Sequence, residues 1–158
     1  MTMKPRVLVV DDDENLCVLY REELESEGYA ITTVQSAEGA IRIVGNDPPD
    51  VIVMDIRMPR MDGIEAMGLM LSRRNNLPVI LNTAYSSYKD DFRSWPASAY
   101  VIKSSDLCEL KLTIKKLLKQ YKRTDASAED RPSMEGPGDP LPTGAPDNKP
   151  LHPLLEAT

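Results

Sequence analysis

Short apolar runs alternate with amphipathic helical patterns five times along the first 123 residues. The runs cover residues 6–10, 29–34, 51–54, 78–81 and 99–102. They are short and mostly rich in β-branched residues, so each is predicted to be a strand. Strands that alternate with helices form parallel sheets, because a parallel connection needs a crossover helix. We therefore expect an α/β fold with a doubly wound parallel sheet of strand order 2-1-3-4-5.

The expected helices lie between these strands and after the last one. Ser36 is a predicted N-cap, and a short polar helix is predicted over residues 87–94. The last helix is predicted to begin at a capping box of Asp106 and Glu109, with Ser105 as an alternative cap. The other face of this helix is either solvated or a docking surface, and it carries Lys111, Lys115, Lys116, Lys119 and Lys122.

Charge is unevenly distributed along the chain. Of 25 acidic and 19 basic residues, seven acids but only two bases lie after Arg123. Neither part has the clustered Lys and Arg that binding to nucleic acid requires. No apolar run approaches the roughly 20 residues of a membrane span, and the first residues lack the apolar core of a signal peptide. Cys17 and Cys108 form no disulfide or metal pattern, which favours a reducing cytoplasm.

The composition changes near residue 123. Residues 124–158 contain seven prolines and three glycines with little large apolar content, and we predict a disordered acidic tail there. Residues 4–123 would be the single folded domain. Within the tail, residues 151–155 are either a short docking motif or a passive segment.

Polar side chains lie at the ends of four predicted strands. Asp11 and Asp12 follow the first, Asp55 follows the third, Thr83 ends the fourth and Lys103 follows the fifth. In an open parallel sheet the carboxyl ends of the strands border the binding crevice, so we expect these side chains to converge. The simpler alternatives are that Asp55 caps a loop and that Lys103 is a counter-ion to the acids.

Converging carboxylates repel one another unless a pKa rises, water stays in the site or a cation binds. Oxygen ligands suit Mg²⁺, which keeps several waters and commonly shares its shell with phosphate oxygens. A metal ion beside Asp55 would make its carboxylate a usable nucleophile toward a phosphoryl group. Lys103 could then pair with a phosphoryl oxygen, and Thr83 could donate its hydroxyl.

Four motifs carry a family resemblance. They are VVDD at 9–12, DIRMPRMDG at 55–63, NTA at 82–84 and YVIK at 100–103. In this order on five alternating strands, they resemble the receiver domain of two-component response regulators, which has a flavodoxin-like fold. The resemblance covers residues 4 to about 123. It implies that Asp55 accepts a phosphoryl group from a sensor histidine kinase or a histidine phosphotransfer protein.

The resemblance also implies roles for individual residues. The implied ligands of Mg²⁺, or of Mn²⁺ in its place, are Asp11, Asp12, Asp55 and the backbone carbonyl of Arg57. Asp12 would bind the ion directly and Asp11 mainly through water. The implied phosphoryl-binding residues are Thr83, Ala84 and Lys103. We interpret Asp13 as a helix cap, with a ligand role as the alternative.

A conformational switch is implied as well. Thr83 would move toward the phosphoryl group and Tyr100 would rotate inward, reshaping the face of the fourth helix, fifth strand and fifth helix. Alternatively, Tyr100 only covers a strand end. That face would bind an unknown downstream protein or pair two copies of the chain. Arg57 and Tyr85, two residues beyond Asp55 and Thr83, resemble the positions that tune phosphoryl lifetime.

One residue departs from the family pattern. Ser104 follows Lys103 where the family usually has proline, often after a cis bond. A cis bond before another residue costs about 2.5–4 kcal/mol, so we expect a trans peptide here.

We therefore predict a stand-alone receiver that signals through protein contacts and is no enzyme beyond its own phosphorylation and slow dephosphorylation. The main alternative is a phosphotransfer intermediate or phosphate sink without a switched surface. A phosphatase of the aspartyl-nucleophile type would need a second carboxylate where Arg57 stands. A phosphorylation-independent interaction module is disfavoured by the complete set of site residues.

Overall fold

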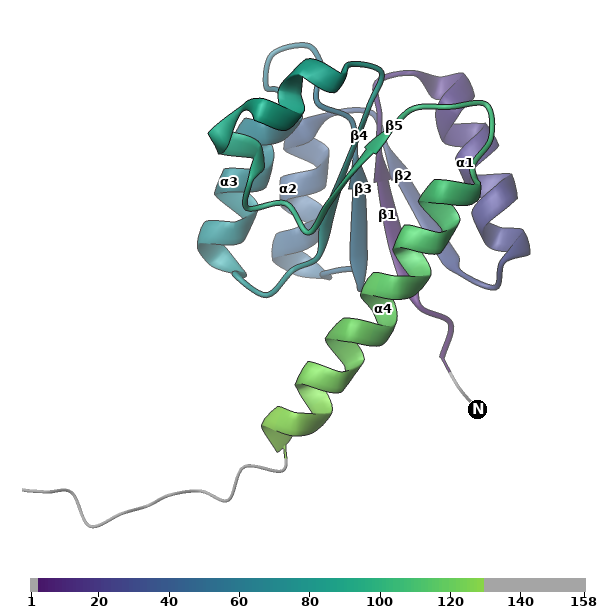
Figure 1. Ribbon diagram of the computed structural model, residues 1–158, viewed down its shortest axis with the longest axis vertical. Coiled ribbons are helices and arrows are strands. Elements are labelled where there is room, and N and C mark those ends of the chain that lie inside the picture. The colour runs from purple at the N-terminus through teal and green to yellow at the C-terminus, as the bar shows by residue number, and fades with distance from the viewer. Residues whose placement is uncertain (1–2, 130–158) are drawn as a thin grey trace, which may run out of the picture.

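The chain folds into one five-stranded parallel sheet with helices on both faces (Figure 1). The computed structural model describes residues 3–129. The strands are β1 (Arg6–Val10), β2 (Ala30–Val34), β3 (Val51–Met54), β4 (Val79–Thr83) and β5 (Ala99–Ile102). The α-helices are α1 (Glu14–Ser26), α2 (Ala37–Asn46), α3 (Gly63–Arg73) and α4 (Cys108–Glu129). The strand order is β2-β1-β3-β4-β5, so the predicted fold class and strand order are confirmed.

Each face of the sheet has its own apolar core, because successive side chains of a strand point to opposite faces. Val51 and Val53 of β3 lie in the core that α1 and α4 cover. Ile52 and Met54 lie in the core that α2 and α3 cover. All four side chains are buried, so β3 is the central strand that its unbroken apolar run predicts.

Short polar side chains begin three of the helices. An Asp13 carboxylate oxygen accepts hydrogen bonds from the backbone N–H groups of Asn15 at 2.9 Å and Leu16 at 3.4 Å. The Ser36 hydroxyl caps α2, accepting from the N–H of Gly39 at 3.1 Å. Both capping predictions are confirmed. An equivalent cap on α3, Asp62, is an addition to them.

The predicted helix over residues 87–94 is wrong. The segment instead forms two short 3₁₀ helices, η1 (Ser86–Asp90) and η2 (Phe92–Ser94), separated by Asp91 in an extended conformation. Local polar side chains compete with helical hydrogen bonding here. The Asp91 carboxylate accepts from the backbone and guanidinium of Arg93, and the Ser94 hydroxyl lies 2.6 Å from the carbonyl of Asp91.

The last helix differs from the prediction at both ends. Asp106 accepts from the N–H of Cys108 at 2.9 Å, but its own N–H donates to the hydroxyl of Ser104, so the reciprocal capping box with Glu109 does not form. At the other end, α4 continues to Glu129, past the predicted boundary at residue 123. Alanine and glutamate are good helix formers, and no proline lies between Pro96 and Pro132 to end the helix earlier. The rest of the predicted tail, residues 130–158, lies outside the described residues.

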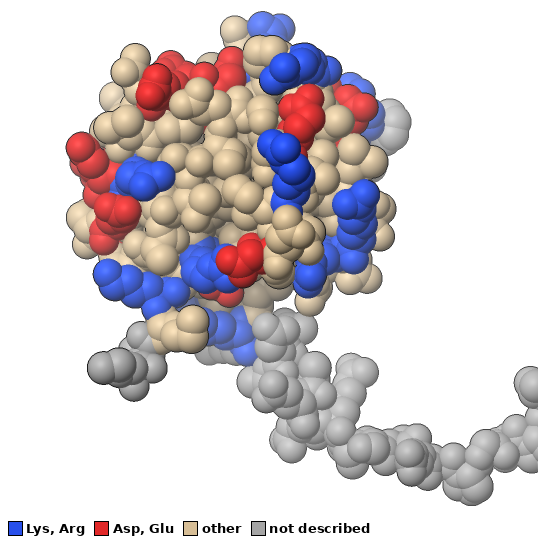
Figure 2. All heavy atoms as spheres, turned by 180° about the vertical axis from the view of Figure 1, so that it is seen from behind, with Lys and Arg blue, Asp and Glu red and all other residues tan. Residues whose placement is uncertain are grey.

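Surface charge is mixed. Lys111 contacts Glu23 at 2.9 Å and Glu27 at 3.4 Å, joining α4 to α1, while the four other lysines of its helix face are exposed. The face shown in Figure 2 carries scattered charges of both signs and no continuous basic surface. Across residues 3–129 no helix combines the length and apolar character needed to cross a membrane.

Candidate functional site at the carboxyl ends of the strands

Three carboxylates converge where β1 and β3 end. The two strands pair in parallel with Val10 opposite Met54, and the Asp55 N–H donates to the Val10 carbonyl at 2.8 Å. The residues that follow these strands are therefore brought together. Asp11, Asp12 and Asp55 each place one carboxylate oxygen within 4.8 Å of the others. Asp11 and Asp55 are buried, whereas Asp12 is exposed, so the cluster opens to solvent on one side.

Lys103 reaches this cluster from the end of β5. Its N–H donates to the Thr83 carbonyl at 2.7 Å, which fixes the backbone beside β4. Its ammonium lies 2.7 Å from Asp11 Oδ2 and 3.4 Å from Asp55 Oδ2. The Lys103–Ser104 peptide is trans, as predicted. Lys103 is therefore the counter-ion of two acids in this structure, and its phosphoryl-binding role stays a prediction.

Burial and neighbouring charges shift the pKa values of the site. Burial raises the pKa of Asp55 to about 6, with Lys103 opposing the rise and Asp11 and Asp12 adding to it. Burial alone would lower the pKa of Lys103. Its hydrogen bond to Asp11, together with the negative charges of Asp11 and Asp55, outweighs burial, and the pKa is raised. The site therefore holds more negative charge than one lysine neutralises.

A divalent cation would complete this charge balance. The oxygens come from three carboxylates, which is a donor set that suits a hard ion such as Mg²⁺. Asp13 stands outside the cluster because its carboxylate caps α1. The donor set therefore fits the ion expected from the sequence, while the predicted ligand role of the Arg57 carbonyl stays a prediction.

Thr83 and Tyr100 meet at the backbone of Tyr85. The Thr83 side chain is fully buried at the end of β4, and its hydroxyl accepts from the Tyr85 N–H at 3.3 Å. The Tyr100 hydroxyl donates to the Tyr85 carbonyl. Ala84 lies between, exposed in the turn. The two predicted switch residues are thus both hydrogen-bonded to the backbone of Tyr85, Thr83 at its N–H and Tyr100 at its carbonyl.

The Arg57 side chain lies against two tyrosines. Its guanidinium carbon is 4.2 Å from the centre of the Tyr85 ring, and its Nε donates to the Tyr88 hydroxyl at 3.0 Å. The two tyrosine rings meet edge to face, with centres 6.4 Å apart. The stack of Arg57 on Tyr85 brings together the two predicted lifetime-tuning residues. Tyr88 was not predicted, because it lies in the segment wrongly assigned as a helix.

Three further residues near the site were given no role by the sequence analysis. The Asn82 amide donates to the Tyr20 hydroxyl at 3.0 Å, and both side chains are buried between β4 and α1. A Cβ atom on Gly63 would lie 2.1 Å from the Asp55 carbonyl oxygen, so glycine permits the loop to pack against the backbone of Asp55. A glycine after a turn-rich segment was the available signal for Gly63. The sequence gives no comparable signal for Tyr20 and Asn82.

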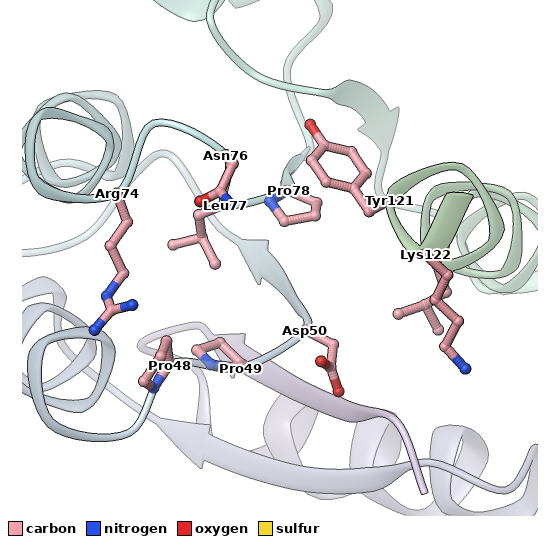
Figure 3. A pocket seen from close by; sticks show the side chains of 10 residues that line it. Pro48, Pro49, Asp50, Arg74, Asn76, Leu77, Pro78, Tyr121 and Lys122 are labelled. Atoms are coloured by element: carbon pink, nitrogen blue, oxygen red, sulfur yellow. The ribbon is translucent and has the colours of Figure 1, made fainter. Parts of the chain in front are cut away.

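A separate pocket of about 260 Å³ lies at the end of the sheet opposite the acidic cluster. Figure 3 shows Arg74, Tyr121 and Lys122 around it, together with Asp50 and a group of prolines. Asp50 and Pro78 precede β3 and β4, so the pocket is at the amino ends of the strands. It contains none of the predicted site residues, and the polar cluster at the carboxyl ends remains the candidate site.

Comparison with known proteins agrees with this geometry. Residues 7–115 match the response regulator receiver domain. The chain is 37% identical to the regulatory protein AtoC of Escherichia coli over 120 residues, which make up 75% of this chain and 26% of AtoC. It is 33% identical to the response regulator MprA of Mycobacterium ulcerans over 134 residues, covering 84% of this chain and 58% of MprA. The chain thus spans only part of either relative's length.

Solved structures of a related protein show the same fold. The response regulator TrrA of Thermotoga maritima, in complex with Mg²⁺ and BeF, has 43% sequence identity and a TM-score of 0.71, covering 73% of this chain and 99% of TrrA. TrrA has also been solved in complex with the histidine kinase ThkA, with the same identity and coverage and a TM-score of 0.69. On the family match and the converging strand ends, this chain belongs to the response regulator receiver domain family of two-component signalling proteins.

Proposed function

We propose that the protein is a phosphoaspartate switch that accepts a phosphoryl group on Asp55 from a phosphohistidine of a partner protein. The observation that carries the proposal is the convergence of three carboxylate oxygens within 4.8 Å beside the ammonium of Lys103. The complexes of TrrA with Mg²⁺ and BeF and with a histidine kinase support it by similarity. As a receiver, the chain is a signalling domain rather than an enzyme with a separate substrate.

Asp11, Asp12 and Asp55, with the backbone carbonyl of Arg57, would hold Mg²⁺ or Mn²⁺. When bound, the ion supplies positive charge that neutralises the carboxylates and the incoming phosphoryl oxygens. Asp12 is the exposed member of the cluster and would bind the ion directly, whereas Asp11 is already paired with Lys103 and would act mainly through water.

The chemical step uses the carboxylate of Asp55 as the nucleophile. One of its oxygens forms a bond to phosphorus as the bond from phosphorus to the histidine nitrogen breaks, and a histidine protonated on its other nitrogen leaves as a neutral ring. Lys103 then exchanges part of its contact with Asp55 for a phosphoryl oxygen. Thr83 donates its hydroxyl to another oxygen, and the N–H of Ala84 is the neighbouring backbone donor.

Phosphorylation would be transmitted through Tyr85. When Thr83 turns toward the phosphoryl group, its hydroxyl is drawn from the Tyr85 N–H, and the Tyr85 carbonyl in turn holds Tyr100. The surface of η1, η2, β5 and α4 would then change and bind a downstream protein or a second copy of the chain.

Two free cysteines, one of them exposed, support a reducing cytoplasmic setting.

The test is phosphorylation by a small-molecule phosphodonor in the presence of Mg²⁺, read by intact mass. We expect one added phosphoryl group on the wild type and none on Asp55→Asn. Asp13→Asn is the matched control, because asparagine also caps helices and this carboxylate lies outside the cluster. Phosphorylation of Asp55→Asn, or its loss in Asp13→Asn, would contradict the assignment.

A second experiment separates a switch from a phosphate sink. Beryllofluoride with Mg²⁺ mimics the phosphorylated state, and Trp95, which is 72% exposed on the segment between η2 and β5, reports on the neighbouring surface. A switch predicts a saturable change in Trp95 fluorescence that Asp55→Asn abolishes. Saturable binding by NMR at Asp55 with no change at Trp95 or Tyr100 would instead favour an intermediate or sink that transfers phosphoryl groups back to a histidine protein.

A further inference from the structure

Tyr88 of η1 links the region beyond β4 to a side chain beside the phosphoryl-acceptor residue. Its hydroxyl accepts a hydrogen bond from the Nε of Arg57 at 3.0 Å. Its ring meets that of Tyr85 at an interplanar angle of 79°. Arg57 follows Asp55 by two residues and Tyr85 follows Thr83 by two, so both flank the ends of adjacent strands β3 and β4. Tyr88 therefore contacts both residues on that flank.

These contacts fix the Arg57 guanidinium in two independent ways. Stacking at 4.2 Å from the Tyr85 ring centre sets where the planar group lies. The hydrogen bond from Nε to Tyr88 sets its rotation within that plane. An arginine that is exposed, as this one is, would otherwise sample many rotamers at little cost. Without the Tyr88 hydroxyl, only the contacts with Tyr85 remain to hold the guanidinium.

Tyr88 is itself well anchored. Its ring is half-buried and packs against the core formed with α2 and α3. Its carbonyl accepts from the hydroxyl of Ser94 at 2.9 Å, and Ser94 is only 5% exposed. The 3₁₀ geometry of η1, in place of the helix that the sequence predicts, presents the Tyr88 hydroxyl to Arg57. The hydroxyl is thus a fixed acceptor for a flexible side chain.

We propose that Tyr88 is a positioning residue that holds Arg57 on Tyr85 as a cover over one side of the site, and so slows the attack of water on phosphorylated Asp55. The inference rests on the proposed function, because it concerns the lifetime of that phosphoryl group. The Asp55 side chain is only 8% exposed, so water has little room to reach it. Arg57 and Tyr85 follow the ends of the paired strands β3 and β4, and an ordered side chain on this flank would reduce that room further. A cover held in one place excludes water better than a mobile one.

The test follows the decay of the phosphorylated protein after the phosphodonor is removed. Tyr88→Phe keeps the ring and removes only the hydroxyl, and we expect decay about two- to tenfold faster, which is the range that one hydrogen bond accounts for. Arg57→Ala should also accelerate decay, and adding Tyr88→Phe to it should change nothing further. Tyr121→Phe is the matched control, since its hydroxyl pairs with Ser98 at the other end of β5 and should leave decay unchanged.

Wild-type decay in Tyr88→Phe would overturn the proposal. So would an equal acceleration by Tyr88→Phe with and without Arg57, because Tyr88 would then act on its own. A third measurement needs no phosphorylation: the Arg57 Nε–H should exchange with water more slowly in the wild type than in Tyr88→Phe by NMR. Equal exchange refutes the positioning role even if Asp55 accepts no phosphoryl group, a failure that would count against the proposed function separately.

Discussion

Replacing Asp55 by asparagine should stabilise the metal-free protein at neutral pH. Burial raises the pKa of Asp55 from 3.8 to about 6, with opposition from Lys103 and a further rise from Asp11 and Asp12. The folded protein therefore holds this proton more tightly than the unfolded chain does. As pH rises through the interval between these two values, the folded state loses stability, and above about 6 the whole penalty is present. Asparagine has nearly the same shape and no charge to bury.

The size of the effect follows from the shift. Each pKa unit corresponds to about 1.4 kcal/mol, so a shift from 3.8 to about 6 sets an upper bound of about 3 kcal/mol. Water at the open side of the cluster screens part of this penalty, and we expect a gain of about 1–3 kcal/mol in the free energy of unfolding near pH 8. Near pH 5 most folded molecules carry the proton on Asp55, so the gain should fall to about half.

The assay is urea unfolding in EDTA, followed by circular dichroism at several pH values. The control is Asp90→Asn, an exposed acid of η1, which should change the free energy of unfolding by less than about 0.5 kcal/mol. Adding Mg²⁺ should stabilise the wild type more than Asp55→Asn and narrow the gap, since the ion binds the folded carboxylates. The reasoning fails if Asp55→Asn is less stable than the wild type near pH 8, or if its gain does not depend on pH.

Three further substitutions probe residues around the site. Asp13→Ala should lower the free energy of unfolding by about 1 kcal/mol through loss of the α1 cap, and calorimetry should find Mg²⁺ affinity unchanged; a large loss of affinity would make Asp13 a ligand. Gly63→Ala should lower the free energy of unfolding by about 1–3 kcal/mol and slow phosphorylation, because the added Cβ meets the Asp55 carbonyl. Wild-type stability and wild-type phosphorylation in this variant would contradict the close packing. Tyr20→Phe leaves the buried Asn82 amide without its acceptor and should lower the free energy of urea unfolding by about 1–3 kcal/mol. An unchanged unfolding midpoint would mean that water replaces the hydroxyl.

Much of the fold was predictable because its three central strands, β1, β3 and β4, are buried. The unbroken apolar run of β3 lies between Asp50, which follows two prolines, and Asp55, so its limits follow directly from the sequence. The segment between β4 and β5 was not predictable in the same way. It contains no Val, Ile, Leu or Met, and local contacts such as Asp91 with Arg93 decide its conformation. Hydrophobic periodicity carries little information about such a segment.

The site was predictable to the extent that it depends on where strands end. Asp11, Asp55 and Lys103 follow apolar strands, and parallel pairing alone brings them together. Contacts between side chains of distant segments have no such rule. The hydrogen bond between Tyr20 and Asn82 joins residues 62 positions apart and depends on how α1 packs on the sheet. Periodicity shows that both side chains are inside, but it does not show that they are partners.

Every side chain of the acidic cluster and its lysine follows a strand, and none is supplied by a helix. The helices instead form most of the outer surface on both sides of the sheet (Figure 1). For the proposed function, the chemistry would therefore depend on the strand ends and the choice of partner mostly on the helix surfaces. A substitution at an outward-facing helical position would then alter the proposed docking surface and leave the carboxylate of Asp55 unchanged. The same arrangement of strand ends could in this way be combined with different helix surfaces in different signalling proteins.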